Sequence, residues 1–282
     1  MRLTSFLHDG KESYGAVVDS GVIDFGHRLG DRLPTLRDAL EADALTQLER
    51  ESSSAADLSL DDISFLPVIP LPRRIVGIGV NYRQNLPEGG ADPTYPSIFL
   101  KLPSSVVGHG QPIIRPRVSE MLDFEGELAV IIGKKGRRIA ASGALDHVAG
   151  YTCFNDTTIR DWQRHGTIAL PGKNFFRCGS CGPWLVTADE VGDPSKLWLK
   201  TVLNGVEMQD SSTEMIFDVA TLIEYVSGFT PLEAGDVIAT GTPNGVGMQR
   251  NPPVWLKDGD VIEVTISGIG TLLNPIEDES DA

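Results

Sequence analysis

Two glutamates stand one residue apart, as Glu125-Gly126-Glu127, directly before the apolar run at 128–132. Side chains alternate along a strand, so positions 125 and 127 face the same side. Two carboxylates on one face beside apolar neighbours repel each other and lose hydration, so they need a cation nearby. A third acid, Asp156, follows a second strand-like run that reaches Asn155.

Three carboxylates form a ligand set of oxygen atoms only. Such a set suits a hard divalent cation, Mg²⁺ with Mn²⁺ or Ca²⁺ as alternatives, whereas zinc prefers His or Cys. A simpler interpretation stays open at this point, since Glu-x-Glu is also typical of a solvated strand edge. Asp156 can equally cap a helix over 157–165, in which Arg160 and Gln163 share its face.

The three cysteines do not predict a reactive site. Cys178 and Cys181 have the CxxC spacing, but a zinc site would need a second pair and only Cys153 remains. A papain-like thiol enzyme would need a downstream His, and no His follows position 178. We interpret Cys178 and Cys181 as small side chains in a turn.

The segments that must position the acids are mostly strands. Helices are expected from 34 to about 50, over 157–165 and over 218–227, the last capped by Asp218. Many strands with few helices predict a mixed, β-rich α+β fold with a closed or sandwiched β core. β-branched and apolar runs predict strands, after short ones within 1–25, at 75–80, 97–101, 127–132, 150–155, 184–187, 197–203, 237–240 and 261–266.

A change of composition divides the chain near residues 62–72. Residues 51–62 are polar and Ser-rich, which is typical of a linker, and Pro67, Pro70 and Pro72 then stiffen the backbone. We therefore expect a small β-rich N-terminal domain with one helix at 1–62 and a larger domain at 70–282.

The overall charge argues against several classes of partner. The 282 residues include 24 Lys and Arg against 39 Asp and Glu, a formal charge of −15. Nucleic acid and anionic membrane surfaces both need clustered basic residues, so neither is an expected partner. No apolar run approaches the ~18 residues that a membrane span needs, and residues 1–10 lack the apolar core of a secretory signal. The expected location is the cytoplasm.

A series of short blocks, in order between residues 73 and 275, resembles the fumarylacetoacetate hydrolase family. Each block is weak by itself, whereas the ordered set is specific. The resemblance implies a mixed β-sandwich roll as the catalytic domain, beside the small N-terminal domain, and usually a homodimer. The blocks are Gly-Val-Asn-Tyr at 79–82, Lys-Leu-Pro-Ser-Ser at 101–105, Asp-Phe-Glu-Gly-Glu-Leu-Ala at 123–129, Gly-Tyr-Thr-Cys-Phe-Asn-Asp at 150–156, Arg-Asp-Trp-Gln at 160–163, Gly-Lys at 172–173, Gly-Pro-Trp at 182–184, Asn-Gly at 204–205 and Gly-Asp-Val-Ile-Ala-Thr-Gly-Thr-Pro at 235–243.

The resemblance also implies roles for individual residues. Metal ligands fall on Glu125, Glu127 and Asp156, and the positive charge that polarises the substrate falls on Lys173. Backbone N–H groups around Gly241 are expected to hold a carboxylate. The remaining site residues fall on Arg160, Gln163, Tyr82, Lys101 and Thr242.

Members of this family act on small 2-oxo and 1,3-diketo acids. The leading expectation is a Mg²⁺-dependent hydrolase that cleaves a C–C bond of an acylpyruvate-like 2,4-dioxo acid through a metal-stabilised enolate. The same enolate would serve an isomerase, tautomerase or decarboxylase of a 2-oxo dicarboxylic acid, such as oxaloacetate or 5-carboxymethyl-2-hydroxymuconate. A non-catalytic protein that binds a 2-oxo acid is the alternative from a different class.

Hydrolytic members of the family often read Asn-Tyr-x-x-His-x-x-Glu, and this chain departs from that pattern. Asn85 replaces the His, while Glu88 remains. An Asn cannot act as a general base near neutral pH. Either Glu88 acts alone, or His109 or His165 substitutes, or the reaction needs no hydrolytic base. Residues 83–96, rich in Gly and Pro, are expected to form a mobile lid.

A second departure follows Lys173. Phe176 stands where many relatives carry an Asp, which predicts a less polar rim for the pocket. The choice of substrate therefore stays open.

Overall fold

The computed structural model describes residues 1–19, 21–166 and 169–280. Strands dominate, and they form a 12-stranded sheet, a 5-stranded sheet and a 2-stranded pair in this part of the chain. The prediction of a mixed, β-rich α+β fold is confirmed. Within the described ranges, no helix combines the length and the apolar character that crossing a membrane requires.

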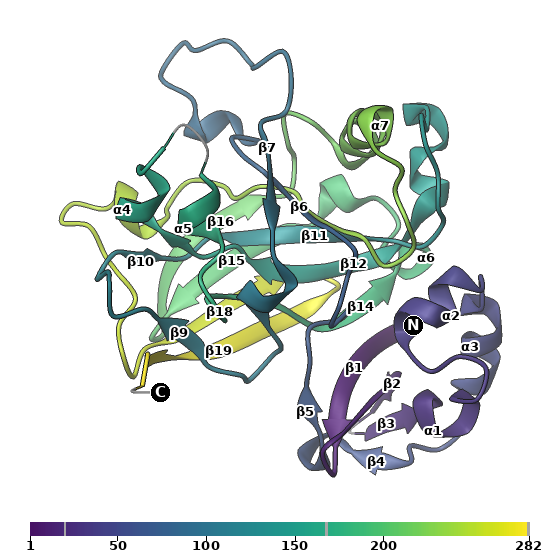
Figure 1. Ribbon diagram of the computed structural model, residues 1–282. Coiled ribbons are helices and arrows are strands. Elements are labelled where there is room, and N and C mark those ends of the chain that lie inside the picture. The colour runs from purple at the N-terminus through teal and green to yellow at the C-terminus, as the bar shows by residue number, and fades with distance from the viewer. Residues whose placement is uncertain (20, 167–168, 281–282) are drawn as a thin grey trace.

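An antiparallel meander begins the chain, as the pattern of residues 1–25 predicted. Strands β1 (Arg2–His8), β2 (Lys11–Val18) and β3 (Gly21–Asp24) pair in order, and β4 (Leu58–Ser59) and β5 (Ser64–Phe65) add to β3 and β1. Figure 1 shows these strands beside the helices α1 (Phe25–Leu29), α2 (Leu36–Glu41) and α3 (Leu45–Glu51).

Two expectations for this part of the chain were wrong in detail. The single helix from 34 to 50 is in fact α2 and α3, because Asp43 between them has a φ of 53° that a right-handed helix does not allow. The stretch 51–62 is not a free linker, since β4 within it extends the sheet. The sheet also crosses the expected boundary, because β1 pairs with β14 (Gly179–Thr187). The division into 1–62 and 70–282 stays a prediction.

The large sheet continues from β14 through the middle of the molecule. Every residue of β11 and β12, two of its inner strands, is buried. Strands covered on both faces are apolar along their whole length, which explains why these segments read as continuous apolar runs. Beside β14 lie, in order, β12 (Val148–Asn155), β11 (Gly126–Ile132), β17 (Val237–Ala239), β6 (Ile75–Ile78) and β7 (Ile98–Lys101), and β8 (Val106–Val107) pairs with β14 separately.

Alternate residues of β11 pack into two hydrophobic clusters. Ala129 and Ile131 join a cluster that includes the N-terminal strands and helices. Leu128, Val130 and Ile132 pack with α7 (Val219–Phe229) and with the second sheet. The second sheet has the order β16 (Val206–Ser212), β15 (Trp198–Leu203), β18 (Val261–Ile266), β19 (Gly270–Asp278) and β9 (Ile113–Arg115).

The predicted cap of α7 is confirmed. The carboxylate of Asp218 accepts a hydrogen bond from the backbone N–H of Thr221 at 2.8 Å. Further short helices are α6 (Ala188–Val191) and, in 3₁₀ form, Leu60–Asp62, Arg83–Asn85, Pro103–Ser105, Ala141–His147, Pro194–Lys196 and Gly247–Gln249, in addition to the two described next.

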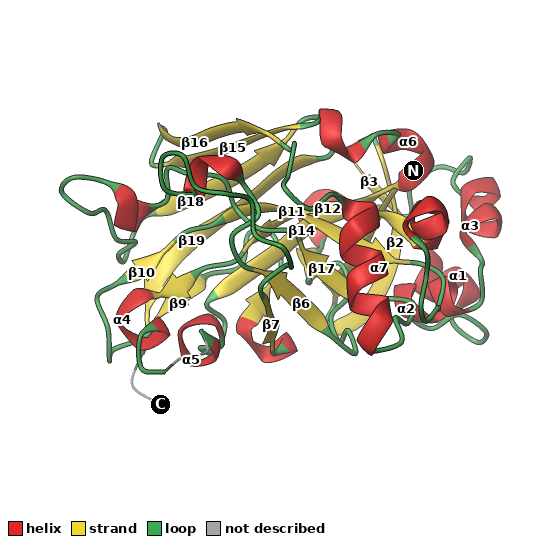
Figure 2. Cartoon of the chain, turned by 90° about the horizontal axis from the view of Figure 1, so that it is seen from above, coloured by secondary structure: helices red, strands yellow, loops and turns green. Residues whose placement is uncertain are grey.

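Short elements at the opposite end from α1–α3 carry several candidate residues (Figure 2). Strand β10 (Leu122–Asp123) pairs with β13 (Thr158–Ile159), and α4 (Arg160–Gln163) and α5 (Leu170–Lys173) follow. The helix expected over 157–165 is therefore only α4, and Asp156 does not cap it. The β-branched side chains of Thr158 and Ile159 favour the extended conformation that β13 adopts.

The interpretation of the CxxC pair as a turn was wrong for one member. Cys181 lies within β14, and only Cys178 follows a turn. All three cysteines are free and buried, and burial raises the pKa of the Cys181 thiol to about 12. Burial likewise raises the pKa of Cys153 and Cys178, so these thiols are protonated at neutral pH.

Candidate metal centre

Three carboxylates that lie far apart in the sequence meet beside the ends of β11 and β12. Glu125 precedes β11, Glu127 lies within it, and Asp156 follows β12. The antiparallel pairing of β11 with β12 matches Gly126 to Asn155, so the two strand ends lie side by side. One carboxylate oxygen from each acid lies within 4.8 Å of the other two. Their exposed fractions are 7%, 1% and 0%, so this is no solvated strand edge.

Basic side chains surround the carboxylates. The Lys173 Nζ atom lies 2.5 Å from Glu125 Oε2 and 2.7 Å from Asp156 Oδ2. Lys101 reaches the other Asp156 oxygen at 2.8 Å, and Arg160 reaches Glu125 Oε1 at 2.7 Å. All three cations are buried. The sequence-predicted Lys173, Lys101 and Arg160 therefore belong to one cluster with the acids.

The buried cluster has an excess of negative charge. Four carboxylates, those of Asp123, Glu125, Glu127 and Asp156, face the three cations, which leaves 4 − 3 = 1 negative charge unbalanced. Glu127 makes no ion pair with any described residue and instead accepts a hydrogen bond from the N–H of Gly241 at 2.9 Å. A divalent cation supplies charge where the protein lacks it, and oxygen ligands suit Mg²⁺ or Mn²⁺. The residues present therefore fit such an ion.

The pKa directions follow from this arrangement. Burial, and then the negative charges of Asp156 and Glu125, raise the pKa of Glu127 well above its ordinary value. Burial alone would raise the pKa of Asp156 too, but Lys101 and Lys173 lower it below its ordinary value. Burial alone would lower the pKa of Lys173, yet the carboxylates of Asp156 and Glu125 raise it. Lys173 is therefore a fixed positive charge near neutral pH.

The Tyr82 hydroxyl is buried and makes no hydrogen bond with the described residues. Burial, followed by the charge of Glu127, raises the pKa of Tyr82 above its ordinary value. A protonated hydroxyl beside the acids is available as a donor to a ligand. Gln163 lies at the rim, where its Oε1 atom accepts from the guanidinium of Arg160 at 3.2 Å.

Asn85 and Glu88 belong to the segment that departs from the hydrolytic pattern, and their surroundings differ from each other. Asn85 donates to the carbonyl of Thr242 at 2.8 Å and accepts from Gln249 at 3.1 Å. Glu88 is exposed, and the described residues offer it no ion pair or side-chain hydrogen bond. It lies in the loop between the 3₁₀ turn at Arg83–Asn85 and β7, which stands out from the body of the molecule (Figure 1).

Neither alternative histidine contacts the acids. His109 Nδ1 accepts from the N–H of Leu273 at 3.1 Å, and its ring packs edge-on against Phe65. His165 is exposed and lies against Trp162, with 4.7 Å between the ring centroids. Phe176 is 68% exposed and lines an apolar hollow of about 430 Å³ together with residues of α4 and α5.

The sequence pattern predicted no role for Asp123, although this residue begins the block at 123–129. Its carboxylate is fully buried and accepts from Arg160 Nε at 2.7 Å and from the N–H groups of Gly247 and Met248 at 2.7 and 3.1 Å. Asp123 thereby fixes the guanidinium that touches Glu125. Only its position two residues before Glu125 hinted at this role.

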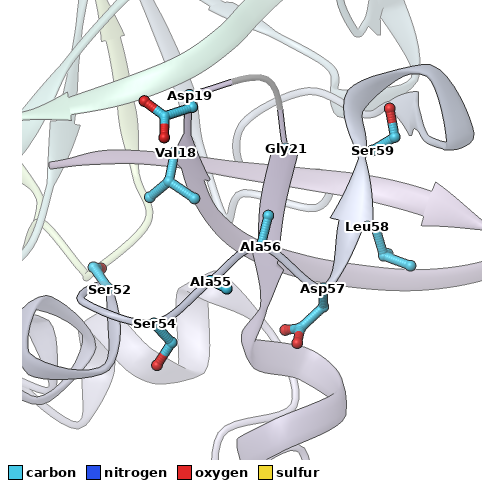
Figure 3. A pocket seen from close by; sticks show the side chains of 10 residues that line it. All are labelled: Val18, Asp19, Gly21, Ser52, Ser54, Ala55, Ala56, Asp57, Leu58 and Ser59. Carbon is cyan, nitrogen blue, oxygen red and sulfur yellow. The ribbon is translucent and has the colours of Figure 1, made fainter.

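A separate hollow of about 810 Å³ lies at the edge of the N-terminal strands, between the end of β2 and the segment 52–59 (Figure 3). Mostly small or polar residues line it, among them two acids, Asp19 and Asp57. Asp57 is already paired with Arg28 at 2.7 Å. The residues that line this hollow include no set of three acids such as the one beside β11 and β12.

Residues 74–277 match the family described as Fumarylacetoacetate (FAA) hydrolase C-terminal. The chain belongs to the fumarylacetoacetate hydrolase family. The resemblance drawn from the short blocks is thereby confirmed.

Relatives within the fumarylacetoacetate hydrolase family are enzymes with several activities. The chain is 44% identical over 227 residues to the mitochondrial oxaloacetate tautomerase of Xenopus laevis, covering 78% of this chain and 70% of that protein. The structure of fumarylacetoacetate hydrolase from Exiguobacterium antarcticum has a TM-score of 0.81 at 34% identity, over 99% of this chain and 100% of that one. A maleylpyruvate hydrolase from Sphingobium, in complex with manganese(II) and pyruvate, has a TM-score of 0.83 at 28% identity, with the same coverage.

Proposed function

We propose that this chain is a divalent-metal-dependent tautomerase that interconverts the keto and enol forms of a small 2-oxo dicarboxylic acid of the oxaloacetate class. The observation that carries the proposal is the buried set of Glu125, Glu127 and Asp156, with Lys173 in contact with two of them. The similarity to an oxaloacetate tautomerase supports the reaction class.

Glu125, Glu127 and Asp156 would hold the cation. When bound, a divalent cation supplies a Lewis acid that makes the proton beside a 2-oxo group easier to remove. Lys173 adds a fixed positive charge at the same place, where an enolate oxygen gains negative charge. Tyr82 offers a free hydroxyl to that oxygen. Arg160 is held by Asp123 and Glu125, so it orients a metal ligand.

Tautomerisation is favoured over hydrolysis by the residues around Asn85. Hydrolysis needs a base that activates water, and Asn cannot act as one. Glu88, the remaining member of the hydrolytic pair, is exposed. Tautomerisation moves one proton between carbon and oxygen and needs no attacking water.

Hydrolysis of an acylpyruvate-like 2,4-dioxo acid, the leading expectation from the sequence, is the second candidate. The similarity in fold to a maleylpyruvate hydrolase supports it. In that case Glu88 would be the base and the segment 83–96 would have to close over the acids. Decarboxylation of oxaloacetate would use the same enolate. A homodimer and a cytoplasmic location stay predictions.

A parallel assay separates these reactions. Metal-free protein is loaded with Mg²⁺ or Mn²⁺ and given freshly dissolved enol-oxaloacetate or a small 2,4-dioxo acid. If the protein speeds the loss of the enol absorbance while the total amount of oxaloacetate stays constant, the tautomerase is supported. Formation of pyruvate from oxaloacetate indicates decarboxylation. Loss of the diketone absorbance with release of pyruvate from the second substrate indicates hydrolysis. Metal and 2-oxo acid binding with no turnover of either compound would contradict an enzymatic role.

Glu127→Gln is the control variant for this assay. It keeps the side-chain shape and removes one ligand charge, so metal binding and turnover should be lost together. Turnover at the wild-type rate by this variant would show that the carboxylates are not the active centre.

A further inference from the structure

The hydroxyl of Thr242 makes one donor and one acceptor contact within the protein. It donates to the carbonyl oxygen of Gly126 at 2.8 Å and accepts from the Gln209 Nε2 atom at 2.8 Å. A hydroxyl has one proton to donate. The proton of Thr242, which the family resemblance placed among the site residues, is therefore used within the protein.

Gln209 completes the same network from β16. Its side chain is only 1% exposed, and its Oε1 atom accepts from the N–H of Gly126 at 3.0 Å and from the hydroxyl of Thr201 at 2.8 Å. Its Nε2 atom also donates to the carbonyl of Pro243 at 2.9 Å. Both polar backbone groups of Gly126 are thus bound by this one network.

Gly126 is the residue between the two glutamates, and its packing leaves no room for a side chain. A Cβ atom at this position would lie 2.3 Å from the Thr201 hydroxyl oxygen and 3.2 Å from Gln209 Oε1. Glycine is therefore required for the close approach of the network to the backbone. Any displacement of Gln209 or Thr242 would be passed directly to the peptide groups that carry Glu125 and Glu127.

The loop of Thr242 reaches the acids a second time. The neighbouring N–H of Gly241 donates to Glu127 Oε2 at 2.9 Å, and Gly241 has a φ of +98° with its Cβ position 2.9 Å from Asn81 Cβ. The backbone amide that was expected to hold a substrate carboxylate is thus bound to a carboxylate of the protein. The loop therefore contacts Glu127 directly through Gly241, and it contacts the backbone between the two glutamates through Thr242.

We propose that Gln209 and Thr242 are positioning residues for Glu125 and Glu127, acting through the backbone of Gly126. This inference rests on the proposed function, because it takes the carboxylates as metal ligands. Partners that orient the ligands of a metal typically change its affinity 10–100-fold when they are removed.

The test measures Mn²⁺ binding to the substrate-free chain by electron paramagnetic resonance. Thr242→Val removes the hydroxyl at constant shape, Gln209→Met removes the carboxamide at similar length, and Thr242→Ser restores the hydroxyl. Both of the first two variants should bind Mn²⁺ about 10–100-fold more weakly, and Thr242→Ser should recover most of the affinity. Thr265→Val, which removes a hydroxyl bonded to Thr271 on β18 and β19, is the matched control and should bind like the wild type.

A double-mutant cycle tests whether the two residues act as one unit. Thr242→Val combined with Gln209→Met should weaken Mn²⁺ binding far less than the product of the single effects, because either change already breaks their shared contact. Circular dichroism checks folding of each variant. If Thr242→Val does not fold, the comparison uses the weaker Mn²⁺ binding of Gln209→Met and the near-wild-type Mn²⁺ binding of Thr242→Ser.

Steady-state kinetics at saturating Mn²⁺ supply the second measurement. A positioning role predicts a lower kcat with KM for oxaloacetate changed little, whereas a direct contact with substrate predicts a raised KM. Wild-type Mn²⁺ affinity with a raised KM in Thr242→Val would overturn this inference and leave the proposed function intact. No Mn²⁺ binding by the wild-type chain would instead overturn the proposed function, and this inference with it.

Discussion

Single residues set the charge of the candidate centre. Glu127 is buried and has no cationic partner among the described residues, while Glu125 and Asp156 share Lys173. An unpaired buried carboxylate beside two others is unfavourable until a cation arrives. Under the proposed function, affinity for a divalent ion and a lower stability of the metal-free chain would have the same source.

Glu127→Gln should stabilise the metal-free chain while weakening metal binding. Removing the unpaired charge relieves repulsion of the order of 1 kcal/mol, or roughly 2–4 °C in Tm. Mn²⁺ at about 100 times its Kd should add about 2.7 kcal/mol to the wild type and much less to the variant. Thermal melts with and without Mn²⁺ measure both effects, and a lower metal-free Tm for the variant would contradict the explanation.

Gly126 should be intolerant of even one added carbon. Gly126→Ala would bring Cβ to 2.3 Å from the Thr201 hydroxyl, so we expect a loss of about 1–3 kcal/mol in the free energy of unfolding. Thr201→Ala removes the obstructing oxygen. The double variant should therefore lose less free energy of unfolding than the sum of the two single losses. Strict additivity in urea denaturation would argue against a steric cause.

Short elements hold the basic residues against the acids. The pair β10 and β13 ends at Asp123 and leads into α4, so the carboxylate of Asp123 and the guanidinium of Arg160 meet in a buried contact. Because Thr158 and Ile159 form β13 instead of a helix, Asp156 is not used as a cap. Its carboxylate is free to contact Lys101 and Lys173.

Asp123→Ala should be strongly destabilising. It leaves Arg160 with one acid and removes the acceptor of the Gly247 and Met248 amides, which predicts a loss of about 3–5 kcal/mol. Asp278→Ala is the control, because it breaks the exposed pair with Arg115 between β9 and β19 and should cost below about 1 kcal/mol. Equal losses for the two variants in urea denaturation would contradict this ranking.

At the scale of the whole molecule, one sheet and one hydrophobic cluster join the N-terminal strands to the site. β1 pairs with β14, and Leu3 and Tyr14 share a cluster with Ala129 and Ile131 of β11. Ala129 and Ile131 alternate in phase with Glu127, so the N-terminal part of the chain covers the face of β11 that carries Glu127, further along the strand.

We therefore expect the chain to unfold in one cooperative step. Leu3→Ala should lower the free energy of unfolding by about 2–5 kcal/mol and shift the loss of secondary structure and the release of bound Mn²⁺ to the same lower temperature. Circular dichroism and electron paramagnetic resonance on the same samples measure the two events. Mn²⁺ release at an unchanged temperature would mean that 1–62 is an independent domain.

The sequence by itself determined the chemical groups and many of the elements. The alternation around Glu125 and Glu127, the apolar runs of β11 and β12 and the cap at Asp218 are local patterns, and local patterns fix strands and caps. The ordered blocks determined the family. Only the tertiary structure decided that the Thr242 hydroxyl donates to the backbone of Gly126 and that the Gly241 amide donates to Glu127. It also decided that Asn85 donates to the carbonyl of Thr242 and that Glu88 is exposed. These contacts join residues more than a hundred positions apart, and their partners depend on strand register and packing, which no local spacing encodes.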